Sequence, residues 1–214
     1  MKKTNLHTVY KTADGKRVPG VTTIIGILNK PQLLYWVANV TREGKDWTKV
    51  RDDAAGVGTL THAMIFSHLR GEAMDTSEYS PEDVSRAETC LIKYRDWEKE
   101  HPNMENELLE HPMISEQFGY GGTIDRLSLI DGNLVLIDYK TGKEIYDDMW
   151  LQMAGYKQLL EENGHFITSA RILRIGRDEN EGFEEQTRKD LTTEWEIFRR
   201  LREVYELKKV KGGE

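Results

Sequence analysis

The chain has 214 residues, of which 31% are charged, and its formal net charge is -7. This length is enough for one α/β domain with its own core, and the acidic balance argues against tight binding along an extended duplex. No apolar run approaches the roughly 20 residues of a membrane span. The single cysteine, Cys90, cannot form an intrachain disulfide or hold an iron–sulfur cluster, and a reducing cytoplasmic setting is expected.

The N-terminal part predicts a small hairpin followed by short helices. Residues 7–18 read as two strands around an Asp14-Gly15 turn, and residues 21–28 and 31–41 as helices. Gly56 and Gly58 then mark the beginning of an apolar helix whose first turns contain His62. A lone helical histidine is usually a hydrogen-bonded core or surface residue. The alternative is a metal ligand that the helix delivers to a distant site.

The middle of the chain predicts a long helix and then strands. Ser80 is a good N-cap with Pro81 at the first helical position, and the helix should end near Glu100. Residues 104–110 and 113–118 then have strand character. Glu116 stands just before the next strand. Its side chain is either solvated or close to the edge of that strand.

Residues 119–140 predict a β-hairpin around an Asp131-Gly132 turn. Residues 134–137 form a continuous apolar run, as in a strand that is buried on both sides. Residues 123–130 alternate in character. The residues expected to share one face of that strand are Ile124, Arg126, Ser128 and Ile130.

Charged residues at the end of this hairpin suggest a site. Asp138 and Lys140 are two residues apart at the end of a hydrophobic strand, so their side chains should share a face. Asp125, on the paired strand, can reach the same place. Two carboxylates and an ammonium around one spot suit a divalent metal and a phosphate. The alternative for the Asp-x-Lys triplet alone is a surface ion pair of little energetic value.

The remaining elements are a helix over residues 145–162, a strand over 168–175, a possible edge strand over 183–187 and a helix over 191–210. Gln152 and Tyr156 are four residues apart and share a helix face. They could contact a nucleic-acid backbone or be ordinary polar residues of an amphipathic helix. The whole chain, residues 1–214, is predicted to be one domain.

The order of these motifs resembles the RecB-type branch of the PD-(D/E)XK nuclease superfamily, which also holds phage-type exonucleases. The resemblance runs from the Gly-rich helix with His62 through Gly122-Thr-Ile-Asp125-Arg126 and Ile137-Asp138-Tyr139-Lys140 to Gln152 and Tyr156. It departs from the family at Ile124, which takes the place of the proline in the family name.

The resemblance implies a restriction-endonuclease-like α/β (α+β) fold, with a mixed sheet of about four to five strands flanked by helices. Residues 1–55 would form an N-terminal hairpin and helices, residues 56–187 the nuclease core, and residues 188–211 a C-terminal helix. Catalytic roles fall to Asp125, Asp138, Lys140 and, as an additional acid, Glu116. The implied metal ligands are His62, Asp125, Asp138 and the main-chain carbonyl of Tyr139, and the implied DNA contacts are Gln152, Tyr156, Arg126 and Thr141.

The implied activity is hydrolysis of DNA phosphodiester bonds with one or two Mg²⁺ or Mn²⁺ ions and no iron–sulfur cluster. An exonuclease of recombination, repair or phage DNA processing is favoured over an endonuclease. DNA is the expected partner, with a recombination or replication protein as a candidate second one, in the cytoplasm of a bacterium or an infected host. The alternatives are a DNA-binding scaffold without catalysis and a sugar or nucleotide phosphohydrolase.

Overall fold

The computed structural model describes residues 8–211. A mixed five-stranded sheet forms its centre, in the order β3-β4-β5-β6-β7, and a separate two-stranded sheet, β1-β2, packs against β3 and β4. The elements are β1 Tyr10–Lys11, β2 Arg17–Val18, α1 Val21–Ile25, α2 Pro31–Arg42, α3 Trp47–Arg70, α4 Pro81–Lys99, β3 Met104–Ser115, β4 Tyr120–Ile130, β5 Asn133–Lys140, α5 Asp147–Glu162, β6 Ser169–Ile175, β7 Phe183–Arg188 and α6 Thr192–Lys211. The predicted fold class is confirmed.

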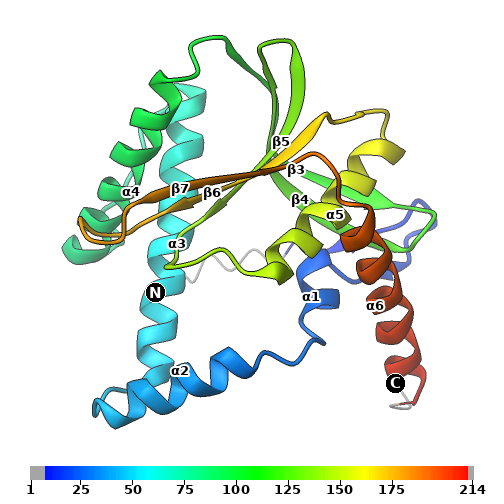
Figure 1. The fold of residues 1–214 in the computed structure, drawn as a ribbon, viewed down its shortest axis with the longest axis horizontal. Helices are drawn as coiled ribbons and strands as arrows, with labels where there is room; N and C mark the ends of the chain where they lie inside the picture. The colour runs from blue at the N-terminus through cyan, green and yellow to red at the C-terminus, as the bar shows by residue number, and fades with distance from the viewer. Residues whose placement is uncertain (1–7, 212–214) are drawn as a thin grey trace.

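Helices cover both faces of the large sheet, with α3 and α4 on one side and α1, α5 and α6 on the other (Figure 1). One apolar cluster joins β4 and β5 to α5 and α6 through Leu136, Trp150 and Phe198. A second joins β5 and β6 to α3 and α4 through Phe66, Tyr94 and Tyr139. Because β5 is covered on both faces, its apolar run is continuous rather than alternating.

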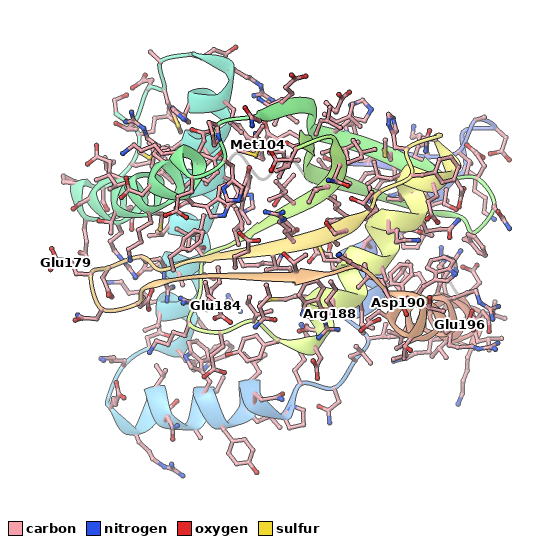
Figure 2. All side chains as sticks on the ribbon, turned by 45° about the horizontal axis from the view of Figure 1, so that its top comes forward. Met104, Glu179, Glu184, Arg188, Asp190 and Glu196 are labelled. Carbon is pink, nitrogen blue, oxygen red and sulfur yellow. The ribbon has the colours of Figure 1, made fainter. Side chains whose placement is uncertain are left out.

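Strand pairing accounts for the mixed sheet. β5 runs antiparallel to β4 and parallel to β6, with α5 as the crossover between the two parallel strands. β7 pairs antiparallel with β6 and forms the predicted edge strand. Figure 2 shows Glu179 at the turn between β6 and β7, and Glu184 and Arg188 along β7. Charged residues on an edge strand discourage pairing with another chain.

Helix α3 differs from the prediction, because it begins at Trp47 and not at the glycines. The Asp46 side chain caps it by accepting a hydrogen bond from Thr48 N at 2.9 Å. Gly56 and Gly58 therefore lie inside the helix. The predicted cap of α4 is confirmed, since Ser80 accepts a hydrogen bond from Asp83 N.

Two strand predictions also need correction. Residues 104–118 contain one strand, β3, rather than two, with a register shift between Asn106 and Leu108. On β4, Ile124 packs in the cluster with α5, whereas Ile130 packs in the cluster with α3 and α4, so the alternation changes phase between them. Glu110, which lies between the β3 residues paired with this part of β4, has a φ of 45°. Such a φ is unusual for a residue other than glycine and marks the irregularity beside Asp125.

None of the helices in the described part of the chain combines the length and apolar character that crossing a bilayer requires.

Candidate active site

The C-terminal end of β5 presents a buried acid and a lysine. Asp138 is only 2% exposed, and Lys140 Nζ lies 2.6 Å from its Oδ2 atom. Residues 135–139 are all buried, because β5 is a central strand covered by helices on both faces. An ionised carboxylate in such a place loses its hydration and needs a compensating partner. Lys140 provides the nearest positive charge.

Asp125 reaches the same place from β4. The last registered pair of the β4–β5 ladder is Arg126 with Ile137, so Asp125 and Asp138 are the next residues of the two strands. Asp125 Oδ2 accepts a hydrogen bond of 2.9 Å from the backbone N–H of Tyr139. A side chain thus takes the place of a strand carbonyl at the point where the ladder ends. The sheet geometry brings the two predicted acids together.

His62 arrives from α3 and contacts the same two strands. Its Nδ1 atom lies 3.6 Å from Asp125 Oδ1, and its Nε2 atom lies 2.9 Å from the carbonyl oxygen of Tyr139. Gly58, one turn earlier, explains the close approach. A Cβ atom at this position would come within 2.8 Å of Thr141 Oγ1, so a larger residue would push α3 away from the end of β5.

Gln152 of α5 connects the acid to the lysine. Its Oε1 atom accepts a hydrogen bond from Lys140 Nζ at 3.1 Å, and its Nε2 atom lies 3.2 Å from Asp138 Oδ1. The same amide donates to the Tyr156 hydroxyl at 2.9 Å. Tyr156 is 5% exposed, and its ring approaches so closely that a Cβ on Gly122 would lie 2.6 Å from it. Tyr156 therefore lies inside the protein and holds Gln152, rather than being exposed as the implied DNA contact would be.

The charged side chains of this cluster shift one another's pKa values. Burial raises the pKa of Asp138 to about 6, although Lys140 opposes the rise. Burial would also raise the pKa of Asp125, but His62 and Lys140 lower it overall. The pKa of His62 is raised because Asp125 outweighs the effect of burial, and the pKa of Lys140 is raised because Asp138 does the same. Titratable groups in mutual contact that shift one another's pKa values are typical of functional sites.

The donor atoms of this cluster fit a divalent cation. Asp138 is buried, and its Oδ2 atom lies 2.6 Å from the Lys140 ammonium, the nearest positive charge. The His62 ring stands beside two oxygens that could bind a cation, with Nδ1 3.6 Å from Asp125 Oδ1 and Nε2 2.9 Å from the Tyr139 carbonyl oxygen. Carboxylate and carbonyl oxygens with one imidazole suit Mg²⁺ or Mn²⁺. Within residues 8–211, however, no three His, Cys, Asp or Glu side chains are arranged as a ready metal site. The residues that could hold the ion contact one another instead.

Comparison with known families decides what this chain is. The profile of the PD-(D/E)XK nuclease superfamily matches residues 36–213. The chain belongs to the PD-(D/E)XK nuclease superfamily. The predicted family is therefore confirmed, and nucleases of this superfamily generally use divalent metal ions. No protein with a curated description matches the chain.

Several solved structures are similar at low sequence identity. A candidate exonuclease from Eubacterium rectale is 13% identical, with a TM-score of 0.47, and the match covers 75% of this chain and 68% of that one. The alkaline exonuclease of Laribacter hongkongensis is 15% identical, with a TM-score of 0.34 and coverage of 75% and 90%. Its complex with dAMP gives 14% identity, a TM-score of 0.38 and coverage of 75% and 91%.

Two predicted site residues of this PD-(D/E)XK chain lie elsewhere. Glu116 is exposed at the β3–β4 turn, where its carboxylate accepts a hydrogen bond from Ala13 N at 2.8 Å. Ser115 pairs with Tyr120, so Asp125 is five strand residues, about 17 Å, from that end. Arg126 is 1% exposed and donates to the Tyr94 hydroxyl inside the core. The structure therefore does not support Glu116 as a catalytic acid or Arg126 as a DNA contact.

Sequence reasoning missed an ion pair beside the cluster. Lys30 Nζ lies 2.6 Å from Asp148 Oδ2, and both residues line a small hollow of about 90 Å³ together with Gln152. Asp148 also contributes to the raised pKa of Lys140. The sequence could have indicated Asp148, because it precedes Gln152 by four residues and so shares its helix face.

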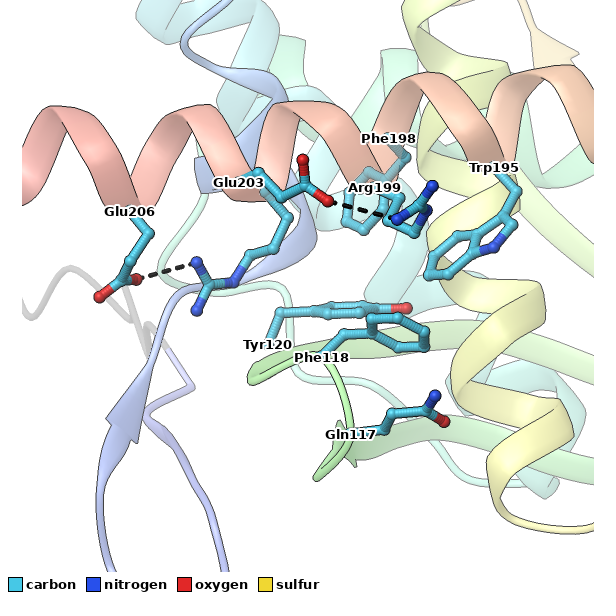
Figure 3. Close-up of a pocket in the computed structure, with 9 residues that line it drawn as sticks. Gln117, Phe118, Tyr120, Trp195, Phe198, Arg199, Glu203 and Glu206 are labelled. Atoms are coloured by element: carbon cyan, nitrogen blue, oxygen red, sulfur yellow. Dashed lines mark hydrogen bonds and ion pairs between the residues drawn. The ribbon is translucent and has the colours of Figure 1, made fainter.

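A larger pocket of about 270 Å³ lies between α6 and the start of β4 (Figure 3), and neither Asp125 nor Asp138 lines it. Its lining combines aromatic residues with charged residues of α6 and one amide: Gln117, Phe118, Tyr120, Trp195, Phe198, Arg199, Arg202, Glu203 and Glu206. Arg199 pairs with Glu203, and Arg202 pairs with Glu206. Because these arginines already have acidic partners, the pocket does not offer a free anion site.

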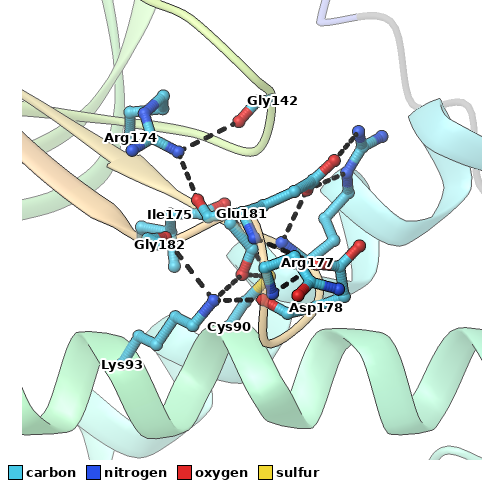
Figure 4. Close-up of polar contacts among 11 residues, drawn as sticks. Cys90, Lys93, Gly142, Arg174, Ile175, Arg177, Asp178, Glu181 and Gly182 are labelled. Carbon is cyan, nitrogen blue, oxygen red and sulfur yellow. Dashed lines mark hydrogen bonds and ion pairs between the residues drawn. The ribbon is translucent and has the colours of Figure 1, made fainter.

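A second polar cluster fastens the β6–β7 turn to α4 (Figure 4). Lys93 donates to the main-chain carbonyls of Gly176, Asp178 and Gly182. Within the turn, Arg177 binds Glu181 through its main-chain N–H and its guanidinium. These contacts connect backbone segments to one another and leave no free carboxylate, so they are structural.

Proposed function

We propose that this chain hydrolyses DNA phosphodiester bonds with Mg²⁺ or Mn²⁺, and that it acts as an exonuclease. His62, Asp125, Asp138 and the Tyr139 carbonyl oxygen would hold the cation. The observation that carries the proposal is the meeting of two acids from adjacent strands at the C-terminal end of β5, where Asp125 contacts His62 and Asp138 contacts Lys140. Membership of a nuclease superfamily supports it.

Each side chain has a distinct role in this proposal. The cation, when bound, lowers the pKa of a water molecule and neutralises charge on the scissile phosphate. The Lys140 ammonium adds positive charge where the transition state becomes more anionic. Gln152 holds Lys140 and Asp138 in their relative position, and Tyr156 fixes the amide of Gln152. Thr141, half-buried next to Lys140, is the proposed DNA contact of the following loop.

The formal net charge of -7 restricts the mode of DNA binding. A protein that follows a long duplex normally presents a basic surface, because its affinity comes from phosphate contacts. An acidic protein with a cation site instead gains its positive charge locally, at the reacting phosphate. An acidic surface with positive charge only at the cation site favours action at a DNA end or on a short stretch of DNA. A role in recombination, repair or phage DNA processing is part of the proposal.

A cleavage assay tests the proposal. Linear and circular DNA, single- and double-stranded and labelled at one end, is incubated with the protein and Mg²⁺ or Mn²⁺, with a chelator as control. We expect cation-dependent release of nucleotides from linear DNA and none from circular DNA. Cutting of circles would indicate an endonuclease, and binding without cutting would indicate a scaffold. Hydrolysis of sugar or nucleotide phosphates alone would indicate a phosphohydrolase.

A further inference from the structure

Arg126 is a buried charge that lacks an acidic partner in direct contact. It is 1% exposed, and its Nη1 atom donates a hydrogen bond of 2.6 Å to the Tyr94 hydroxyl. Among the ion pairs of residues 8–211, none includes Arg126. Burying an unpaired guanidinium costs several kcal/mol in effective terms, and an apolar side chain often serves stability as well or better. The presence of arginine here therefore requires another reason.

The contacts of Tyr94 extend from this arginine to α3. The Tyr94 hydroxyl donates to Glu98 Oε1 at 2.9 Å, and Glu98 Oε2 lies 2.7 Å from His68 Nε2. The arginine thus reaches a carboxylate through one hydroxyl group. This chain of hydrogen bonds fixes the position of the Tyr94 ring against the sheet.

Tyr139 is the point where this network meets the candidate active site. Its ring packs edge-on against the Tyr94 ring, with centroids 5.5 Å apart, and against the His62 ring, with centroids 5.8 Å apart. Its backbone N–H binds Asp125, and its carbonyl oxygen binds His62. The side chain of Tyr139 belongs to the cluster with α3 and α4, whereas its backbone separates two proposed cation ligands.

Arg126 lies directly behind this residue. It follows Asp125 in the chain and pairs in register with Ile137, two residues before Tyr139. The Arg126 guanidinium and the Tyr139 ring lie on the same buried face of the sheet, and both contact Tyr94. If the Tyr94 ring or the Tyr139 ring were displaced, the Tyr139 backbone would move and the distance between Asp125 and His62 would change.

We propose that Arg126 is a positioning residue of the candidate active site. Together with Tyr94 it fixes Tyr139, and the Tyr139 backbone sets the distance between Asp125 and His62 at which a divalent cation is held. This inference rests on the proposed function. Groups that orient metal ligands from behind typically change metal affinity or activity by about 10–100-fold when they are removed.

The test compares Arg126→Met with Arg171→Met. Methionine keeps an unbranched apolar stem and removes the guanidinium with its charge. Arg171 is a matched control because Ile137 pairs with both Arg126 and Arg171, which places the two arginines in one row across the sheet. The Arg171 guanidinium binds Glu185 at 3.2 Å and His101 at 3.3 Å, rather than the tyrosine pair.

Two measurements are made on each protein: the Kd for Mn²⁺ alone by calorimetry, and kcat and KM for cleavage of end-labelled DNA. For Arg126→Met we expect a Kd about 10–100-fold weaker and a kcat reduced to a similar degree, with KM for DNA unchanged. Arg171→Met should match the wild type in all three. Tyr94→Phe, which removes only one hydroxyl, should shift Kd and kcat in the same direction and would decide the matter if Arg126→Met failed to fold.

An Mn²⁺ affinity and kcat of Arg126→Met or Tyr94→Phe equal to those of Arg171→Met would overturn this inference and leave the proposed function intact. A wild-type protein that neither binds Mn²⁺ nor cleaves DNA would overturn the function, and this inference with it.

Discussion

Two polar clusters of this protein contain a lysine surrounded by oxygen atoms, and they differ in what those oxygens are. Lys140 lies 2.6 Å from the buried carboxylate of Asp138 and 3.1 Å from the Gln152 amide oxygen. Lys93 binds main-chain carbonyls of the β6–β7 turn, among them that of Gly176 at 3.0 Å. The first lysine contacts a side-chain carboxylate and an amide, and the second contacts backbone carbonyls that need a donor.

The acids of the two clusters show the same contrast. Glu181 accepts hydrogen bonds from Arg177 on both carboxylate oxygens, and these bonds lower its pKa to about 2. Burial raises the pKa of Asp138 to about 6, although its two oxygens contact the Lys140 ammonium and the Gln152 amide. An acid whose pKa is lowered by its hydrogen bonds stabilises the fold, whereas a buried acid whose pKa is raised would gain from a bound cation. The comparison therefore distinguishes a structural cluster from a candidate catalytic one.

Asp138→Asn should have the largest effect on cleavage. We expect a loss of at least about 10³-fold, because the cation contributes several kcal/mol of charge stabilisation and one of its ligands is weakened. The free energy of unfolding should fall, because the Lys140 ammonium, 2.6 Å from Asp138, loses its charged partner. Initial rates and urea titrations measure the two quantities. A variant that keeps more than a tenth of the wild-type rate would contradict the assignment.

Lys140→Met should reduce kcat by about 10²–10³-fold, the range seen when one group that stabilises transition-state charge is removed. Lys93→Met is the matched control in the other cluster. It should lower the free energy of unfolding, because three carbonyls lose their donor, and leave kcat unchanged at temperatures where it is folded. Equal kcat values for the two variants would remove the distinction between the clusters.

Glu181→Gln should reduce the free energy of unfolding at pH 7 by about 2 kcal/mol, as expected for hydrogen bonds to a charged group. The folded-state pKa of about 2 is below the ordinary value, which is about 4.3 in an unfolded chain. The stabilisation is therefore fully present above the unfolded value and disappears as pH falls toward the folded one. Urea titrations at pH 7 and pH 3 check this. A difference between variant and wild type that grew on acidification would contradict it.

Gln152→Ala should have the smallest effect of the four, a decrease in kcat of about 10-fold, which corresponds to roughly one net hydrogen bond. Its role is to hold Lys140 and Asp138 rather than to react. Gln158→Ala, on the same helix, is a control whose amide binds Glu162. Steady-state kinetics on the same labelled DNA compare the two. If Gln158→Ala were as impaired as Gln152→Ala, the loss would reflect damage to α5.

The sequence predicted the hairpin and its acids because their signals are local. Asp131 and Gly132 both have positive φ values, 47° and 78°, as a two-residue hairpin turn requires. Once this turn fixes the register, the meeting of Asp125 and Asp138 follows. His62 was predicted from the family resemblance, and its contact with Asp125 depends on the closeness of α3, which Gly58 permits.

The predictions for Arg126, Tyr156 and Glu116 depended instead on long-range contacts, because other elements decide which surfaces are covered. Alternation along β4 indicates that Arg126 shares a face with other residues, but it cannot show that Tyr94 of α4 buries that face. The burial of Tyr156 depends on the close approach of Gly122 from another element. Glu116 binds the backbone of the β1–β2 hairpin, a contact 103 residues apart in sequence.

A crystal structure with Mn²⁺, located by its anomalous signal, tests the central claim most directly. The account predicts a peak at about 2.0–2.3 Å from oxygens of Asp125 and Asp138, with His62 and the Tyr139 carbonyl oxygen as further ligands. Asp138→Asn crystals should show a weaker peak or none. A peak at the carbonyls around Lys93, or no peak near the two acids in crystals of an active protein, would contradict it.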